Sequence, residues 1–426
     1  MMDKGPLGAV VLFLILLFFS QACSSPSPEP AGEGEETVAP SPATETPSVA
    51  VTETPSPTET AAPTETPTMS PSPTATVQPT QEPDVVEARP LYRGNRQRTG
   101  VYEGSGVREF ESVQWEFATE DEVHSSPTLA DGVLYFGSDD RHLYAVDAQS
   151  GEEVWRYRAS STIFSSPAVA EGAVYVGSRG LHAVDAETGE ALWHFEPEFT
   201  AFRSSALVAE GTVYVGADNG RLYAVDAETG SEAWAFRGRG AMLSSPALYR
   251  GQVIVGTEGA YLYAVDAESG EEIWQVQLER GIFATPTARD GVVYIGDLTG
   301  AFYALDAGSG ETLWQFDVGQ PFVSSAAVAD GVVYVGNLNK YLFALDAASG
   351  DELWRFETAN EVYGSPSVAS GVVYFGSDDG SLYALETTSG GELWHYETGG
   401  FVGSSPAVGD GVVYFGSYDG KVYAVR

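Results

Sequence analysis

Short apolar runs separated by glycine-containing turns fill the chain from residue 91 to its end. In residues 364–397 the turns contain Gly371, Gly380 and Gly390, and glycine supplies the positive φ that tight hairpins require. No stretch shows the 3.6-residue period of a helix. The pattern therefore predicts four hairpin-linked strands in this unit: Ser365–Ala369, Val372–Gly376, Ser381–Leu385 and Glu392–Glu397. The second of these runs is apolar at every position, which is typical of a sheet buried on both faces.

The same pattern repeats along the chain with a period close to 40 residues. Spacings between successive tryptophans are 40, 38, 41, 40, 40, 40 and 40 residues. A Gly-x-Val-Tyr-x-Gly-like phrase occurs eight times, first at Gly132 and last at Gly411. The eight tryptophans are Trp115, Trp155, Trp193, Trp234, Trp274, Trp314, Trp354 and Trp394. Four strands in each 40-residue repeat indicate the blades of a β-propeller.

The two ends of the repeat array are unequal. The first tryptophan phrase, around Trp115, precedes any other strand of its repeat, whereas the last repeat stops at Val425 without a tryptophan strand. The Trp115 strand can therefore pair as the outermost strand of the C-terminal blade and leave no open edge. We predict an all-β fold: an eight-bladed β-propeller of four-stranded blades, closed by this pairing.

The first 90 residues have a different character and give two further predicted regions. Residues 1–23 combine Lys4, an apolar run from Leu7 to Phe19 and a terminal Ala22-Cys23, which resembles a lipoprotein-type signal peptide with Cys23 as the lipidated residue. Ser20 and Gln21 depart from the usual lipobox, so an ordinary cleaved signal or an uncleaved anchor stays open. Residues 24–90 are rich in Pro, Thr, Ser and Glu, and we expect a disordered linker there. Residues 91–426 form the predicted propeller.

Charge and cysteine content exclude several classes of function. The formal net charge is −39, and residues 91–426 contain 48 acidic against 19 basic residues. Such a surface repels phosphate backbones, so nucleic acid is not an expected partner. Cys23 is the single cysteine, which excludes an internal disulfide and a cysteine-based metal cluster. A saline habitat and a composition bias both remain open as causes of the acidity.

Two sets of residues, which we call columns, occupy equivalent positions in successive repeats. We interpret both columns as structural rather than catalytic. A carboxylate opens the turn before each tryptophan strand, followed three residues later by Thr or Ser and then by Gly. This column contains Asp147, Asp185, Asp226, Asp266, Asp306 and Asp346, with Glu386 in the seventh copy. A short carboxylate there can accept hydrogen bonds and fix the turn, which we favour over a ring of metal ligands. The tryptophan column is interpreted as packing between blades.

The repeat resembles that of a known family. The phrase Tyr-Ala-Val-Asp-Ala-x-(Thr/Ser)-Gly-x-x-x-Trp occurs at 144–155, 223–234 and 263–274 and resembles the tryptophan-docking repeat of the PQQ-repeat, or quinoprotein alcohol dehydrogenase-like, propellers. Residues 92–100 are similar to the opening phrase of such proteins. The resemblance implies either a quinone enzyme or one of the compact, lipid-anchored outer-membrane assembly proteins of the family, which are binding scaffolds.

Catalytic chemistry is not expected. Dehydrogenases of the family hold their quinone with a vicinal cysteine pair and a Ca²⁺ ion bound by Glu, Asn and Asp, and they carry long insertions in their blades. The repeats here have no cysteine and no insertions. The five histidines show no metal-ligand spacing, and the Ser-Ser-Pro sequences at 125, 165, 244 and 404 fall where strands converge on the axis. We predict no catalytic residue, no cofactor and no metal.

A binding surface remains as the functional hypothesis. The residue before each Ser-Ser-Pro-like start varies, although the residue before it is always apolar. Together with variable turns between second and third strands, these positions give a candidate partner-binding face: His124, Phe164, Arg203, Arg221, Leu243, Tyr261, Phe283, Lys340 and Tyr363. Drift at exposed positions is the alternative explanation of this variation.

The overall hypothesis is an exported, membrane-anchored and monomeric propeller that binds a protein or peptide at the cell envelope without catalysis. A ligand-sensing or polysaccharide-binding module, or a PQQ-dependent dehydrogenase, stands as the alternative. The sequence leaves open which partner is bound, which membrane carries the anchor and whether the linker is glycosylated.

Overall fold

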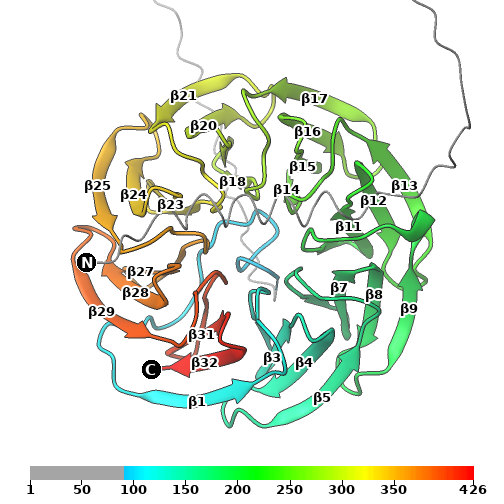
Figure 1. Cartoon of the computed structure of the whole chain (residues 1–426). Helices are drawn as coiled ribbons and strands as arrows, with labels where there is room; N and C mark the ends of the chain where they lie inside the picture. Colours follow the sequence, from blue (N-terminus) through cyan, green and yellow to red (C-terminus); the bar gives the residue numbers. More distant parts are fainter. Residues whose placement is uncertain (1–90) are drawn as a thin grey trace, which may run out of the picture. The chain divides into compact units, whose positions relative to one another are not determined.

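The computed structural model describes residues 91–426, which form eight four-stranded antiparallel sheets arranged as blades around a common axis (Figure 1). The expected eight-bladed β-propeller is confirmed. The predicted signal peptide with Cys23 and the predicted linker lie outside the described residues. Within the described part of the chain, no helix is long and apolar enough to cross a membrane.

Each blade is an antiparallel meander in which the first strand lies innermost. The first four blades contain β2 (Thr128–Ala130), β3 (Val133–Gly137), β4 (His142–Asp147) and β5 (Glu153–Arg158); β6 (Ala168–Ala170), β7 (Ala173–Ser178), β8 (Gly180–Asp185) and β9 (Ala191–Phe195); β10 (Leu207–Ala209), β11 (Thr212–Gly216), β12 (Arg221–Asp226) and β13 (Glu232–Arg237); and β14 (Ala247–Tyr249), β15 (Gln252–Gly256), β16 (Tyr261–Asp266) and β17 (Glu272–Gln277). A 3₁₀ turn, η1 (Pro197–Phe199), follows the second blade.

The remaining four blades repeat the arrangement. They contain β18 (Thr287–Arg289), β19 (Val292–Gly296), β20 (Ala301–Asp306) and β21 (Thr312–Asp317); β22 (Ala327–Ala329), β23 (Val332–Gly336), β24 (Tyr341–Asp346) and β25 (Glu352–Glu357); β26 (Ser367–Ala369), β27 (Val372–Gly376), β28 (Ser381–Glu386) and β29 (Glu392–Glu397); and β30 (Ala407–Gly409), β31 (Val412–Ser417), β32 (Lys421–Val425) and, as fourth strand, β1 (Val113–Ala118).

In the seventh blade, the boundaries of the inner strand differ slightly from the prediction. β26 begins at Ser367 and not at Ser365, because Pro366 has no N–H and the amide of Ser365 donates to the hydroxyl of Ser405 in the next blade. The second strand, β27, has the predicted bounds and is buried at every position, as its continuous apolar run requires.

The first and last strands of the propeller belong to one sheet. β1 pairs antiparallel with β32, and the register runs from Val113 opposite Val425 to Ala118 opposite Lys421. This blade lacks a turn between its third and fourth strands. In the first blade, the carbonyl of Ala148 in that turn accepts the indole N–H of a tryptophan from the preceding blade. In the eighth blade the carbonyl of Val107 takes this role and accepts the indole N–H of Trp394 at 3.0 Å.

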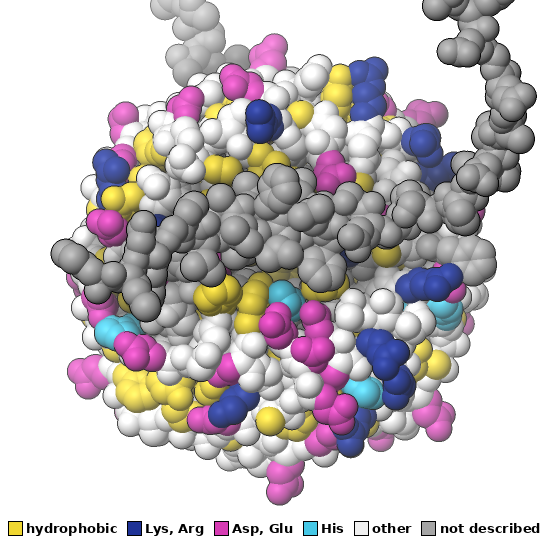
Figure 2. All heavy atoms as spheres, viewed as in Figure 1, with side chains coloured by type: hydrophobic (Ala, Val, Ile, Leu, Met, Phe, Trp, Pro, Cys, Tyr) yellow, Lys and Arg dark blue, Asp and Glu magenta, His cyan; other side chains and the backbone are white. Residues whose placement is uncertain are grey.

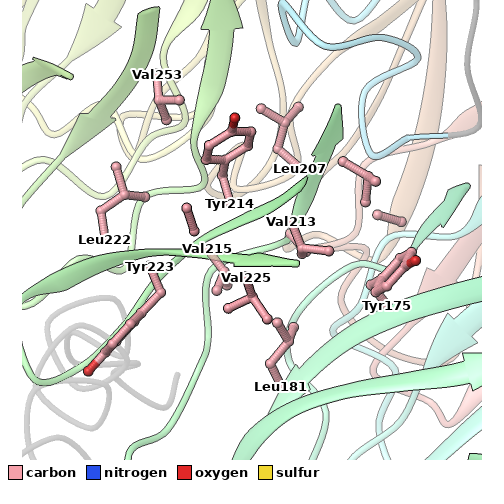
Figure 3. Close-up of a cluster of buried hydrophobic side chains, with 14 of the residues drawn as sticks. Tyr175, Leu181, Leu207, Val213, Tyr214, Val215, Leu222, Tyr223, Val225 and Val253 are labelled. Atoms are coloured by element: carbon pink, nitrogen blue, oxygen red, sulfur yellow. The ribbon is translucent and has the colours of Figure 1, made fainter. Parts of the chain in front are cut away.

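The other tryptophans also join adjacent blades. Trp115, for example, donates its indole N–H to the carbonyl of Ala148 at 3.0 Å, and a Cβ on Gly151 would approach its ring to 2.6 Å. Gly151 also has φ of +74°, so glycine is required there twice over. Between blades lie buried aliphatic and tyrosine side chains; Figure 3 shows one such cluster, to which Tyr175, Val215 and Val253 contribute from three blades. Inter-blade packing is thus the role of the tryptophan column.

The turn carboxylates take the structural role expected of them. The Oδ1 atom of Asp147 accepts hydrogen bonds from the amide and the hydroxyl of Ser150, at 2.7 and 2.8 Å. These hydrogen bonds stabilise the charged form, so the pKa of Asp147 lies below its usual value. Asp185, Asp226 and Asp266 make the same pair of bonds to the Thr or Ser three residues on.

The Ser-Ser-Pro sequences build a belt of hydrogen bonds around the axis. The second serine of one blade donates its amide N–H to the hydroxyl of the equivalent residue in the next blade, as from Ser126 to Ser166 and from Ser166 to Ser205. Seven such bonds occur, and the one from Ser405 to Ser126, at 2.8 Å, joins the last blade to the first. Some first serines bond within a blade, as where Ser165 Oγ accepts from the amide of Gly177 at 2.8 Å, and Ser244 Oγ also donates to the carbonyl of Ala284 in the next blade at 2.9 Å.

Residues 91–102, which we call the axial segment, fill much of the space between the innermost strands (Figure 1). The carbonyls of Arg96, Gln97, Thr99 and Gly100 accept hydrogen bonds from four successive innermost strands, through the amides of Leu248, Ala288, Val328 and Val368. Two arginines hold this segment. Arg98 is fully buried and donates to the carbonyls of Tyr92, Ser205, Ala206 and Pro246, while Arg93 donates to the carbonyls of Arg98 and Ala326.

Candidate functional site

The residues that we singled out for partner binding lie on one face of the propeller, in two different positions. Six of them precede the innermost strands at the mouth of the central channel: His124, Phe164, Arg203, Leu243, Phe283 and Tyr363. With Val323 and Gly403 from the two remaining blades, we call these positions the mouth ring. Each follows a fully buried apolar residue, such as Val123 or Ile163, that anchors it.

The loops that carry the mouth ring contact the turns between second and third strands. The amide of Asp139 donates to the carbonyl of Glu122 at 3.0 Å, and the amide of Leu298 donates to that of Gly281 at 3.2 Å. Side chains also meet at these junctions: Arg203 lies 3.6 Å from Asp218, and His124 packs against Tyr418 with ring centroids 4.0 Å apart and ring planes inclined by 46°. Most ring residues are consequently half-buried.

Arg221, Tyr261 and Lys340 lie farther out. They stand at or just before the start of third strands, next to the ends of the outermost strands, and not at the mouth. Tyr261 accepts a hydrogen bond from the Arg239 guanidinium at 2.5 Å and donates to Gln277, while Lys340 donates to the carbonyl of Ala359. The structure therefore separates these three residues from the other six.

The mouth ring has an apolar sector and a polar sector. The fourth, fifth and sixth blades contribute Leu243, Phe283 and Val323 to it, and Leu298 and Leu338 lie on the adjoining turns. All five side chains are half-buried. These blades are consecutive, so their apolar side chains follow one another around the mouth, with the exposed Glu258 on the turn of the fourth blade.

The polar sector comes from the seventh, eighth and first blades. Burial, together with the charges of Glu361 and Asp379, raises the pKa of Asp378 to about 7. Burial also raises the pKa of Asp139 to about 7, aided by the charges of Asp121, Glu122 and Asp140. Figure 2 shows further acidic side chains on the visible face, interspersed with Lys, Arg and hydrophobic side chains.

One cluster in this sector has the donor atoms of a metal site. Nε2 of His124 lies 3.0 Å from Glu122 Oε2 and 3.5 Å from Asp139 Oδ2, and all three side chains can offer a ligand atom within 4.8 Å of one another. Burial lowers the pKa of His124, which favours its neutral, ligating form. Sequence reasoning missed this cluster, because Asp139 comes from the turn between β3 and β4, whereas Glu122 and His124 share the loop before β2.

Comparison with known proteins places this geometry in a family. The family described as outer membrane protein assembly factor BamB matches residues 107–198, 177–297, 250–324 and 298–426. These matches together cover most of the chain and all eight blades. The chain belongs to the BamB family. No curated protein matches the sequence significantly.

Solved structures similar to this chain include BamB and quinoprotein dehydrogenases. BamB from Moraxella catarrhalis is 19% identical, with a TM-score of 0.65 over 74% of this chain and 99% of that chain. A europium-containing methanol dehydrogenase is 14% identical, with a TM-score of 0.70 over 80% and 98%, respectively. Quinohemoprotein alcohol dehydrogenase from Comamonas testosteroni is 17% identical, with a TM-score of 0.68 over 79% and 80%. At these identities the similarity shows the fold that the BamB family shares with the dehydrogenases.

The residues at the mouth do not fit the quinone site of the dehydrogenases. That site needs a cysteine pair and a Glu, Asn and Asp ligand set, whereas residues 91–426 contain no cysteine and the candidate ligand cluster combines Glu122 and Asp139 with His124. At the mouth, His124 packs against Phe164 and Tyr418, with ring centroids 5.2 and 4.0 Å apart.

Proposed function

We propose that this chain is an extracytoplasmic, non-catalytic scaffold that binds a protein or peptide partner on its mouth ring. The observation that carries the proposal is the composition of the ring. The ring combines apolar side chains from three consecutive blades with Arg203 and the 42% exposed side chain of Phe164, and Phe and Arg are among the residue types enriched in protein interfaces. Membership of the BamB family supports protein partners at the cell envelope.

A non-catalytic role is supported by how the polar groups of the axis are used. The serine hydroxyls that a nucleophile hypothesis would invoke accept backbone amides in the belt or within a blade, as Ser126 and Ser165 do. The two buried arginines hold the axial segment and are directed at backbone carbonyls. A substrate at the axis would have to displace both sets of bonds.

Lipidation of Cys23 supplies the membrane anchor in this proposal. The segment before Cys23 has the size of a signal-peptide core, and Cys23 is the single cysteine of the chain. The proline- and glutamate-rich residues that follow it would then act as a tether between anchor and propeller. The net charge of residues 91–426 disfavours nucleic acid as the partner.

The test is a comparison of two variants by crosslinking from native membranes. The ring variant combines Phe164→Ala, Arg203→Ala and Phe283→Ala. The control combines Glu228→Ala and Glu268→Ala, exposed residues in turns on the opposite face. We expect the ring variant to stay folded and lose its crosslinked partners, because truncating a true interface anchor costs about 2 kcal/mol or more of binding free energy. Retention of the partners by the ring variant, together with their loss from the control, would show that the opposite face binds.

A further inference from the structure

A cavity opens on the opposite face of the propeller, beside the axial segment. It has a volume of about 460 Å³, and its walls include Pro127–Asp131 of the first blade and Ala407–Asp410 of the eighth, together with Val101 and Tyr102 of the axial segment. The innermost strands β2 and β30 therefore face this cavity. It lies at the ends of these strands away from the mouth ring.

The geometry of the hairpins determines which backbone groups point into the cavity. In each three-residue innermost strand the last residue flanks a two-residue turn, such as Asp131-Gly132, whose φ values of 48° and 79° are those of a type I′ turn. The flanking pair, Ala130 and Val133, exchanges both ladder hydrogen bonds, and bonding alternates along the strand. The middle residue therefore directs its N–H and C=O away from its own sheet, toward the axis.

The axial segment shows what these middle residues bind. The amides of Leu248, Ala288, Val328 and Val368 donate to carbonyls of the axial segment at 2.8 to 3.0 Å. The carbonyl of Val368 is also hydrogen-bonded, since it accepts from the amide of Tyr102 at 2.9 Å. Val101 forms a parallel β-bridge with Val368. An extended chain is thus already paired with the inner edge of β26.

The pairing stops before the eighth blade. At Gly104, with φ of +106°, the chain turns outward to deliver Val107 to Trp394. A Cβ on Gly106 would lie 2.5 Å from the carbonyl oxygen of Ala369, so the outward path follows the backbone of the seventh blade closely. The equivalent middle residues of the next two blades, Val408 and Leu129, line the cavity, and their amides have no hydrogen-bond partner among residues 91–426.

We propose that this cavity binds an extended, positively charged peptide segment of a partner protein, which pairs with the free inner edges of β30 and β2. Unpaired backbone groups at a strand edge are a template for an added strand. The charge of the peptide follows from the rim: Glu103, Asp131 and Asp410 are exposed there, and no lysine or arginine lines the cavity. This site is separate from the mouth ring, and the inference does not depend on the function proposed for the ring.

The first experiment uses a fluorescein-labelled Lys-Val-Thr-Val-Thr-Lys peptide and the full chain. We expect saturable binding by fluorescence anisotropy that weakens with salt, and no binding of the peptide with glutamate at both ends. Val408→Pro removes one edge N–H without loss of a ladder bond and should weaken binding about fivefold. Val208→Pro is the matched control, because Val208 is the middle residue of β10 and does not line the cavity.

Asp131→Asn with Asp410→Asn tests the rim without touching the strands, and asparagine tolerates the positive φ of these turns. This variant should bind the peptide more weakly and lose much of the salt dependence, whereas Asp330→Asn in the sixth blade should change neither. Equal weakening by Val408→Pro and Val208→Pro, or no saturable binding to the wild type, would overturn the proposal.

Amide hydrogen exchange on the full chain separates a partner from an internal occupant. We expect the amides of Leu129 and Val408 to exchange faster than those of Leu248 and Val368, and to become protected when the peptide is added. Protection of Leu129 and Val408 before any peptide is added would show that this chain itself fills the cavity, and would overturn binding of a partner.

Discussion

Arg98 offers the sharpest test of how the axis is held, and we expect Arg98→Met to destabilise the propeller by about 2–4 kcal/mol. Its guanidinium is fully buried and donates to four backbone carbonyls, at 2.6, 2.8, 3.1 and 3.3 Å. Hydrogen bonds from a charged group contribute about 1.5 kcal/mol each, or about 6 kcal/mol for the four. Burying the charge costs several kcal/mol, which methionine avoids, so part of that sum is offset.

The assay is urea-induced unfolding followed by tryptophan fluorescence, with amide exchange as a second measurement. The amides of Leu248, Ala288, Val328 and Val368 should exchange faster in Arg98→Met, since their acceptors belong to the segment that Arg98 holds. Arg108→Met is the control, because Arg108 is half exposed and pairs with the exposed Glu386. If Arg98→Met were no less stable than Arg108→Met, the axial segment would not be held by this arginine.

Three further predictions concern other parts of the chain. Cys23→Ser, in the region outside the described residues, should release the protein from membranes or block its maturation, as fractionation and mass spectrometry would show; unchanged mass and location would contradict lipidation. Calorimetry should show no micromolar binding of pyrroloquinoline quinone or Ca²⁺, and stoichiometric quinone binding would contradict the scaffold role. Because the pKa of buried Asp378 is raised from its usual value near 4 to about 7, the folded protein retains a proton between these pH values that the unfolded chain has lost. This carboxyl therefore contributes stability at pH 4 that is lost as the pH rises to 7, so the melting temperature of Asp378→Asn relative to that of Asp330→Asn should rise between pH 4 and pH 7.

The repeat pattern was sufficient to predict the fold, since spacing alone gave eight blades and the unequal ends indicated how Trp115 would pair. The turn carboxylates and tryptophans were predictable because their partners lie within one repeat or in the next. The axial segment was not predictable, because several acceptors of Arg93 and Arg98 belong to blades more than 100 residues away, and nothing in the local sequence indicates that these arginines are buried.

The candidate site was predicted only in part, for a geometric reason. Sequence position shows that His124 and Arg203 follow buried residues, but it does not show which side chains from neighbouring turns cover them. Asp139 and Tyr418 converge on His124 from the first and eighth blades, at opposite ends of the repeat array. Only the closed ring makes them neighbours.

Closure of that ring costs chain entropy, and it can occur only late in the folding of the chain. The pair Ala118 and Lys421 encloses about 300 residues, and bringing the ends of so long a flexible loop together costs about 5 kcal/mol of chain entropy. β1 is made early and β32 is the last strand of the propeller, so this step must wait until the strands of all eight blades have been made. Seven sheets can assemble from neighbouring segments in order of their appearance, whereas the eighth requires the two most distant strands to meet. A chain truncated before Lys421 would retain most of its repeats and leave β1 without its partner.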